Sequence, residues 1–211
     1  MITDIHSNGD GKVKWVSTDW LEYNLDEEFM ILDVQPDIHH YIKELPGAYY
    51  FNEWFLRQIV SNVPGSYIPL EAIQAIFKKQ GIKRNMSTVV YTGKGVYSNS
   101  GDGWGQTMAA YSLLRFGHND LYLLDGSIDK WKKEGKDLTK IFPTIKESKF
   151  EVMLREDYYV TYEEFKAVKD YEDVVVVDAR PFKYYAGPSM WIKPGHSRSK
   201  EIAGSYAYAS R

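Results

Sequence analysis

The stretch with the clearest potential for chemistry is VVYTGKGVYSNSGDGWGQTMAAY, residues 89–111. A short β-branched run leads into a loop with five glycines, and a helix-like segment follows. A strand, a glycine loop and a helix in this order can place backbone N–H groups around an anion. The loop is therefore a candidate anion cradle. The structural alternative is that its glycines only supply positive φ angles in a surface loop.

The glycine spacing argues against a nucleotide phosphate as the anion. Gly101, Gly103 and Gly105 run as GxGxG, which matches neither the GxxxxGK[ST] loop nor the GxGxxG fingerprint. A phosphate would also be repelled by Asp102. A third interpretation of the stretch is a partner-binding surface, because Tyr97 and Trp104 belong to it and exposed aromatic side chains suit an interface.

Composition limits the chemistry further. The 211 residues include no cysteine, which excludes disulfides, thiolate metal sites and a cysteine nucleophile within these residues. The five histidines show no metal-binding spacing, so we predict neither a metal site nor a cofactor. The net charge of −3 gives no electrostatic reason to expect nucleic acid or an anionic membrane as partner.

The start of the chain, MITDIHSNGDGK, lacks an apolar signal core, and no apolar run approaches the roughly 20 residues of a membrane span. A cytoplasmic location is favoured, and an exported mature chain stays open as the alternative.

Elements with strand and helix periodicity alternate along the first part of the chain. Strands are predicted at 29–34, 48–51, 87–92 and 121–126, and helices at 69–81, 105–117 and 127–135, after a short helix capped by Ser17 or Thr18. The run FMILDV is almost continuously apolar, as in a buried parallel strand. The alternation predicts an α/β domain with a central, mainly parallel sheet flanked by helices.

The beginning of the chain recurs near its end. The segment VSTDWLEYNLDEEFMILDV is echoed by VTYEEFKAVKDYEDVVVVDA, and ELPGAYYF is echoed by EIAGSYAY. We therefore predict a first domain at 13–137, a linker at 138–157 that ends in the extended segment KFEVML, and the first part of a second domain at 158–211. The second copy stops early, since only ASR follows its last matching segment, and we expect the chain to be a fragment.

Several of these motifs resemble the tandem-domain rhodanese-like sulfurtransferases, which act on thiosulfate or 3-mercaptopyruvate. In the first copy the resemblance rests on VSTDWL, ILDVQ with LPGAYYF, VVYTGKG, and RFGHNDLYLLDGSIDKWKKEG. In the second copy it rests on VVVVDARPFKYYAG and on PGH within KPGHSRS. The similarity covers nearly the whole chain from Val13 onward, and the motifs occur in family order.

The resemblance implies a cysteine after the third strand, inside the glycine loop, that carries sulfur as a persulfide. Thr92 occupies this nucleophile position here, so the resemblance implies a degenerate active-site loop, made of Thr92, Gly93, Lys94 and Gly95, in a catalytically silent first domain. A threonine hydroxyl cannot form a persulfide. The cysteine of the second domain is expected about 40 residues beyond Arg211, judged by the spacing of the repeat.

Other family positions map onto this sequence as well. Asp178 and Arg180 match the family's Asp-x-Arg, for which the resemblance implies first a structural pair that fixes the loop and, as the alternative, contact of Arg180 with an anionic substrate. Lys183 is a second candidate for substrate contact, although it stands one position early. The resemblance thus implies structural roles for four residues, which are Asp33, Asp178, His118 and His196.

Two functions follow from these observations. The first is a sulfurtransferase that moves sulfane sulfur from a small donor to a thiol or cyanide acceptor through a cysteine outside these residues, the chain as given being inactive. The second is a non-catalytic rhodanese-like module that binds or scaffolds. The missing part of the second domain is a further expected partner of the chain.

Overall fold

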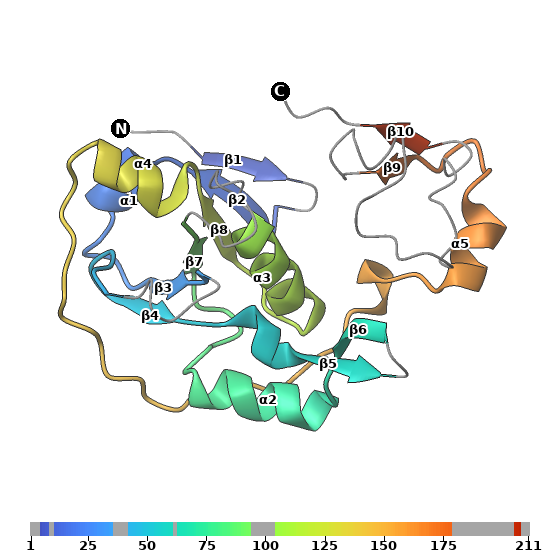
Figure 1. Cartoon of the computed structure of the whole chain (residues 1–211), viewed down its shortest axis with the longest axis horizontal. Coiled ribbons are helices and arrows are strands. Elements are labelled where there is room, and N and C mark those ends of the chain that lie inside the picture. Colours follow the sequence, from blue (N-terminus) through green and yellow to red (C-terminus); the bar gives the residue numbers. More distant parts are fainter. Residues whose placement is uncertain are drawn as a thin grey trace, which may run out of the picture. The chain divides into compact units, whose positions relative to one another are not determined.

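The computed structural model of the chain describes residues 5–8, 11–35, 42–60, 63–93, 104–178 and 205–207. It divides into two compact units, Met1–Arg155 and Glu156–Arg211. Each unit is described by itself below, beginning with the larger one, and Figure 1 labels the elements of both.

Unit 1 contains a six-stranded sheet in the order β1-β2-β8-β7-β3-β4. The strands of this sheet are β1 (Ile5–Asn8), β2 (Val13–Val16), β3 (Met30–Asp33), β4 (Ala48–Tyr50), β7 (Thr88–Tyr91) and β8 (Leu121–Leu124). Neighbouring strands from β2 to β4 all pair in parallel, and β1 pairs antiparallel with β2 at the edge. The prediction of an α/β fold with a mainly parallel sheet is confirmed.

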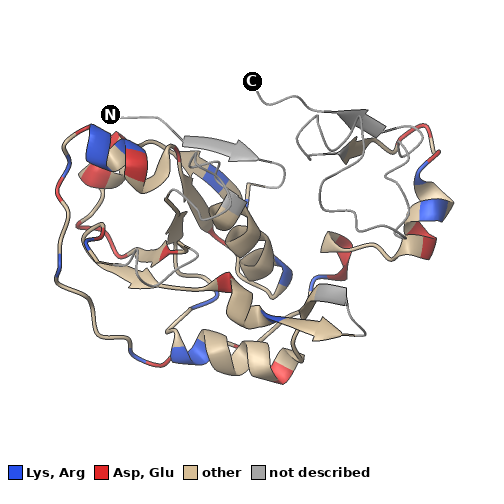
Figure 2. Cartoon of the chain, in the orientation of Figure 1, with Lys and Arg blue, Asp and Glu red and all other residues tan. Residues whose placement is uncertain are grey.

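Four helices belong to this unit: α1 (Thr18–Tyr23), α2 (Leu70–Lys79), α3 (Trp104–Arg115) and α4 (Ser127–Lys133), in the described part of the chain. Helix α2 shows why the sequence forms them. It buries Ile73 and Phe77, which are four residues apart and so lie on one face. Its first turn is acidic and its last turn basic, as Figure 2 shows, which complements the helix dipole.

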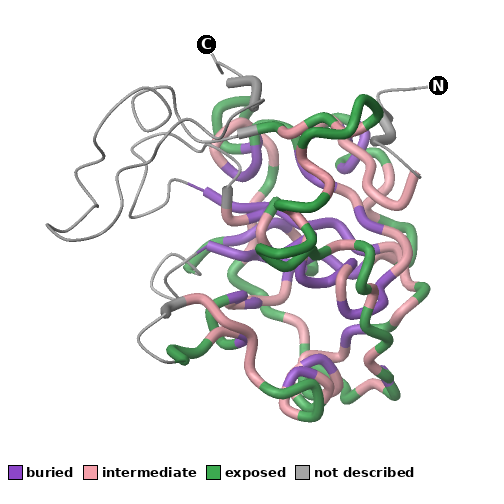
Figure 3. Tube along the Cα trace, turned by 90° about the vertical axis from the view of Figure 1, so that its right-hand side faces the viewer, coloured by how far each residue is buried: buried purple, intermediate pink, exposed green. Residues whose placement is uncertain are grey.

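The core lies on both faces of the sheet, and Figure 3 shows the buried residues gathered along the central strands. One cluster joins Trp20 of α1 and Trp131 of α4 to alternate strand residues such as Ile31 and Val89. The residues that alternate with these along the strands, such as Leu32 and Val90, are also fully buried. Because side chains alternate across a strand, these face the opposite side, where α3 contacts β7 and β8.

Sequence analysis did not predict one part of unit 1, a hairpin of β5 (Arg57–Val60) and β6 (Val63–Tyr67) after the 3₁₀ helix η2 (Glu53–Leu56). The sequence does not reveal this hairpin, because Pro64 interrupts the residue pattern of a strand and the pairing register shifts between Gln58 and Ile59. Arg57 holds the hairpin in place by donating to the Glu53 carboxylate and, at 2.8 Å, to the Tyr67 hydroxyl.

The segment after α4 continues along unit 1 as far as Arg155. Phe150 is buried and packs edge-on against Phe77, with ring centroids 5.1 Å apart. The predicted pairing segment KFEVML forms no strand, but the Met153 N–H donates to the Phe116 carbonyl at 3.1 Å. The domain limits 13–137 and 158–211 stay a prediction.

Unit 2 contains η3 (Glu156–Tyr158), α5 (Tyr162–Val168), β9 (Val176–Asp178) and β10 (Ser205–Ala207) in its described part. Strands β9 and β10 pair in parallel. Helix α5 begins with a capping box, in which Thr161 and Glu164 bind each other's backbone N–H groups. None of the residues of α5 is buried. In the part of the chain that the structure describes, no helix has both the length and the apolar character of a membrane span.

Candidate functional site

Thr92 is the first residue after β7, a central strand of the sheet, and it is only 3% exposed. It stands at the carboxyl ends of the parallel strands, where ligands of α/β proteins bind. The first turn of α3 packs directly on it, because a Cβ added at Gly105 would lie 3.0 Å from the Thr92 hydroxyl oxygen. The strand and the helix of the predicted succession therefore both border Thr92, and the loop between them, residues 94–103, lies outside the described residues.

The turn between β8 and α4 fixes the backbone of Thr92. The Thr92 N–H donates to the Ser127 hydroxyl at 3.2 Å, and the Ile128 N–H donates to the Thr92 carbonyl at 3.1 Å. Ser127 in turn donates to the Gln106 side-chain carbonyl at 2.6 Å. Ser127 has a φ of +51°, a conformation that non-glycine residues rarely adopt. Backbone strain of this kind concentrates at functional sites, where the surrounding contacts maintain it.

Gly93 is closely packed on the other side of Thr92. A Cβ at this position would lie 2.5 Å from the Gln35 side-chain oxygen and 3.0 Å from Ile128. The glycine is therefore required by close approach rather than by a positive φ. Gln35 is itself held by Asp33, whose two carboxylate oxygens accept from the Gln35 backbone N–H at 2.9 Å and from its side-chain amide at 2.8 Å.

A buried acid pair lies behind this part of the site. Asp33 and Glu44 are both fully buried, and their carboxyl groups interact electrostatically with each other. Burial raises the pKa of Glu44 to about 8, and the neighbouring Asp33 raises it further in the same direction. Burial also raises the pKa of Asp33. Tyr91, the residue before Thr92, donates its hydroxyl to Glu44 at 2.5 Å.

His118 lies apart from this site, in the turn that leads from α3 into β8. Its Nδ1 accepts from the Asp120 N–H at 3.3 Å, and its Nε2 lies 3.0 Å from the Thr88 hydroxyl. Burial lowers the pKa of His118 to about 4, so the ring is neutral at physiological pH. These surroundings support the predicted structural role of His118.

The structure thus brings Thr92, Gly93 and Asp33 together at one edge of the sheet. Asp178 lies in β9, where it pairs with Ala207. Five predicted site residues lie outside the described residues, as do Tyr97 and the side chain of Trp104; the five are Lys94, Gly95, Arg180, Lys183 and His196.

Four residues of the site were not predicted from the sequence, namely Gln35, Glu44, Gln106 and Ser127. The recurrence of ELPG as EIAG was the one signal that could have drawn attention to Glu44. Gln35 ends the motif ILDVQ, and Gln106 and Ser127 lie in the stretch 89–111 and in RFGHNDLYLLDGSIDKWKKEG. Nothing in those segments marks these three residues, because they meet only when the carboxyl ends of β3, β7 and β8 come together.

The chemistry open to this site is limited. Among the described residues, the hydrogen-bonding partners of Thr92 are neither histidines nor carboxylates, so none of them serves as a base for its hydroxyl. A search of the same residues finds no group of three or more His, Asp or Glu side chains that could hold a metal ion. The described part of the site thus holds a small side chain at position 92 and offers no base that would activate it.

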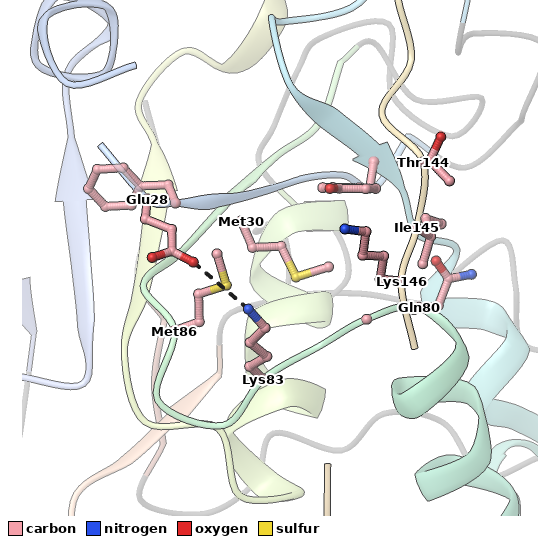
Figure 4. A pocket seen from close by; sticks show the side chains of 11 residues that line it. Glu28, Met30, Gln80, Lys83, Met86, Thr144, Ile145 and Lys146 are labelled. Carbon is pink, nitrogen blue, oxygen red and sulfur yellow. Dashed lines mark ion pairs between the residues drawn. The ribbon is translucent and has the colours of Figure 1, made fainter. Parts of the chain in front are cut away.

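A separate cavity of about 300 Å³ opens near the amino end of β3 and is shown in Figure 4. Met30 and Met86 lie inside it, and Lys83 and Glu28 form an ion pair of 3.9 Å at its side. The strands β3 and β7 run parallel, so the cavity and Thr92 lie toward opposite ends of them. None of the predicted site residues that the structure describes lines this cavity.

Comparison with known proteins agrees with the fold. The strand that ends before Thr92 and the helix that begins beside it, at the carboxyl edge of a mainly parallel sheet, define the class as an α/β domain. The rhodanese-like domain family matches residues 17–134, more than half of the chain, and the chain belongs to this family.

Individual relatives are sulfur-handling proteins. The sulfur carrier protein TtuD of Thermus thermophilus is 29% identical over 149 residues, which are 70% of this chain and 49% of TtuD. The mitochondrial thiosulfate/3-mercaptopyruvate sulfurtransferase 1 of Arabidopsis thaliana is 31% identical over 134 residues, which are 58% of this chain and 33% of that protein. The chain spans about half the length of the curated relatives it matches.

A solved structure shows the same fold. SseA from Escherichia coli, a 3-mercaptopyruvate sulfotransferase described by its rhodanese fold, matches with a TM-score of 0.72 and 20% identity. The match covers 92% of this chain and 74% of SseA.

Proposed function

We propose that the chain is part of a sulfurtransferase in which unit 1 is a non-catalytic rhodanese-like domain. The observation that carries this proposal is the position of Thr92, which stands at the end of β7 under the first turn of α3, where the family resemblance places the sulfur-carrying cysteine. The position of the nucleophile is formed, but the threonine at this position cannot carry sulfur as a persulfide.

The proposed reaction needs a thiolate. The thiolate attacks the outer sulfur of a donor such as thiosulfate, the sulfur–sulfur bond of the donor breaks, and sulfite leaves with the bonding electron pair. The resulting persulfide gives its outer sulfur to cyanide or to a second thiol, and the thiolate is regenerated. Because the 211 residues contain no cysteine, the nucleophile would come from residues outside this sequence, in the proposed second domain.

The donor and acceptor of the whole protein are proposed by class. The relatives named for thiosulfate and 3-mercaptopyruvate support a small anionic sulfur donor, with a thiol or cyanide as acceptor. Residues that complete unit 2 would be the further partner of the chain.

The experiment is a thiocyanate assay on the purified 211-residue chain with thiosulfate and cyanide. We expect no turnover from the chain as given. In Thr92→Cys we expect a persulfide to form with thiosulfate, because the dipole of the 12-residue helix α3 favours a thiolate at its amino end.

Thr144→Cys is the matched control, because position 144 is exposed and lies far along the chain from the loop. Each variant carries a single thiol, so mass spectrometry of the intact chain assigns the added sulfur without ambiguity. Turnover by the unmodified chain would contradict the proposal that unit 1 is silent. Equal persulfide formation in Thr92→Cys and Thr144→Cys would show that the loop no longer stabilises a thiolate.

An alternative function, a non-catalytic binding module, has one specific observation in its favour. Trp54, Phe55 and Ile59 of η2 and β5 are between 51% and 74% exposed, which suits a surface that contacts another protein. The coding sequence that follows codon 211 separates the two functions. A cysteine in the corresponding loop of the second copy supports the enzyme, whereas threonine, serine or aspartate there supports the binding module.

A further inference from the structure

We propose that Asp33 and Glu44 share one proton in the folded chain and, through it, position the residues on both sides of Thr92. This sharing is a property of folded unit 1 and does not depend on sulfur transfer by the protein.

The hydrogen bonds of the pair leave one place for a proton. The Glu44 Oε2 atom accepts from the Tyr91 hydroxyl at 2.5 Å. The two Asp33 oxygens accept from the backbone and side-chain N–H groups of Gln35. Glu44 Oε1, in contrast, is buried and has no hydrogen-bonding partner among the described residues. A buried carboxylate oxygen without a donor is costly, so the proton of the pair belongs on Glu44 Oε1, while Asp33 is satisfied as a carboxylate.

The electrostatics also favour one proton. Both side chains are fully buried, and two adjacent carboxylates would repel each other strongly in a medium of low dielectric constant. The groups that face the pair are the Tyr91 hydroxyl of β7, the Gln35 amide, and the charge of exposed Lys132 on α4. Tyr91 stays neutral, since burial and the two acids hold its pKa well above the ordinary value. A single distant ammonium group cannot balance two negative charges.

The pair is connected to Thr92 from both directions. Glu44 binds the hydroxyl of Tyr91, which immediately precedes Thr92. Asp33 orients Gln35, whose side-chain oxygen lies against Gly93, which immediately follows Thr92. Glu44 also joins this edge of the sheet to the segment after α4, because its N–H and carbonyl both bond to Thr139, at 2.9 and 2.8 Å. Asp33 and Glu44 are therefore positioning residues for the nucleophile position, residue 92.

Loss of the shared proton has a defined sign. The folded pKa of Glu44, about 8, lies above the ordinary value of 4.5, so the folded chain binds the proton more tightly than the unfolded chain does. The stability that this proton provides is complete below pH 4.5 and is lost as the pH rises toward and past 8. Between pH 7 and 9 His118 stays neutral and therefore adds nothing to this loss, which thermal unfolding over that range measures.

The test compares the pH dependence of the unfolding midpoint in the full chain and in Glu44→Gln. In this variant the side-chain carbonyl accepts from Tyr91 and the amide nitrogen takes the place of the protonated oxygen, so the geometry is kept without a titrating proton. We expect the midpoint of the unmodified chain to fall by on the order of 5 °C between pH 7 and 9. The Glu44→Gln midpoint should stay level over the same range.

The matched control is Glu53→Gln, which also changes a buried glutamate. Glu53 accepts from Arg57 and Ser112 and makes no contact with the Asp33 pair. This variant should unfold at a lower temperature and keep the alkaline fall of the unmodified chain. An alkaline fall of equal size in Glu44→Gln would overturn the proposal.

A second measurement covers the case in which a variant does not fold. Infrared spectra of the unmodified chain should show the carbonyl band of a protonated buried carboxyl group at pH 7, and this band should disappear by pH 9 and be missing in Glu44→Gln. Hydrogen exchange reports the positioning role. At pH 9 the Thr92 amide should exchange faster in the unmodified chain than in Glu44→Gln, and at pH 6 the two should agree. Absence of the infrared band at pH 7 would contradict the shared proton, and equal exchange at pH 9 would contradict the positioning role.

Discussion

The strand pairs β3·β4 in unit 1 and β9·β10 in unit 2 have the same register. In the first pair Ile31 stands opposite Ala48, the residue after Gly47. In the second pair Val176 stands opposite Ser205, the residue after Gly204. Ile31 and Val176 each lie two residues before the aspartate that ends the strand. Two segments almost 150 residues apart therefore build the same local structure, which supports the internal repeat inferred from the sequence.

The helices before these strands also begin in the same way. Ser17 caps α1 by accepting from the backbone N–H three residues later, and Thr161 caps α5 by accepting from the N–H at the same spacing. Both caps follow a valine, at positions 16 and 160. The sequence echo thus corresponds to equivalent helix starts.

The two regions differ in burial. Leu32 of β3 is fully buried, whereas Val177, at the corresponding position of β9, is 59% exposed. The strand β3 lies between β7 and β4, and helices pack on both faces of its sheet, whereas β9 pairs only with β10 among the described residues. The comparison teaches that a local motif fixes strand pairing and helix starts, while burial requires the rest of the sheet and its helices.

The largest expected effect is a difference in unfolding free energy between substitutions at the equivalent positions Leu32 and Val177. Leu32→Ala should lower the free energy of unfolding by about 2–5 kcal/mol, because it leaves a cavity in the core of unit 1. Val177→Ala should change it by less than about 0.5 kcal/mol, as is usual for exposed positions. Urea unfolding of the two variants measures both. A large effect at Val177 would show that unit 2 buries this strand in solution and would break the comparison.

The next largest effect is the loss of stability in acid, which we assign to the buried His118 of unit 1. Its folded pKa of about 4 lies below the ordinary value of 6.5, so the folded chain resists protonation of the ring. Stability is complete above pH 6.5 and declines as the pH falls toward 4, by at most about 3 kcal/mol.

Replacement by an uncharged amide tests this assignment. His118→Gln should be less stable at neutral pH and should lose less stability between pH 6.5 and 4.5 than the unmodified chain. Unfolding midpoints across this range decide the matter, and an unchanged acid slope in the variant would assign the acid sensitivity to other groups.

The smallest expected effect compares the two helix caps. Ser17→Ala should cost about 1 kcal/mol of unfolding free energy, because α1 buries Trp20 and Leu21 and folds together with the core. Thr161→Ala should reduce the helical circular dichroism of α5 and leave the unfolding midpoint of unit 1 in place, because α5 buries none of its residues. Equal shifts of that midpoint in both variants would show that the units unfold as one.

Much of the fold could be predicted because its signals are local. The strand 29–34 and the helix 69–81 were predicted within two residues of β3 and α2, since an apolar run and a helical apolar stripe need no distant information. The hairpin β5–β6 was not predicted, because its stability comes from the contacts of Arg57 with Glu53, Tyr67 and Ser112 across three elements. Contacts of that kind leave no periodic pattern.

The sequence by itself determined that no cysteine is present, that a threonine follows the third predicted strand, and that the opening segment is repeated. Composition and local spacing contain this information completely. Only the tertiary structure decided what surrounds Thr92: the strained turn at Ser127, the close packing of Gln35 on Gly93, and the acid pair of Asp33 and Glu44. The physical reason is that these groups come from separate parts of the chain and acquire their distances, burial and pKa values only when parallel strands place their carboxyl ends side by side.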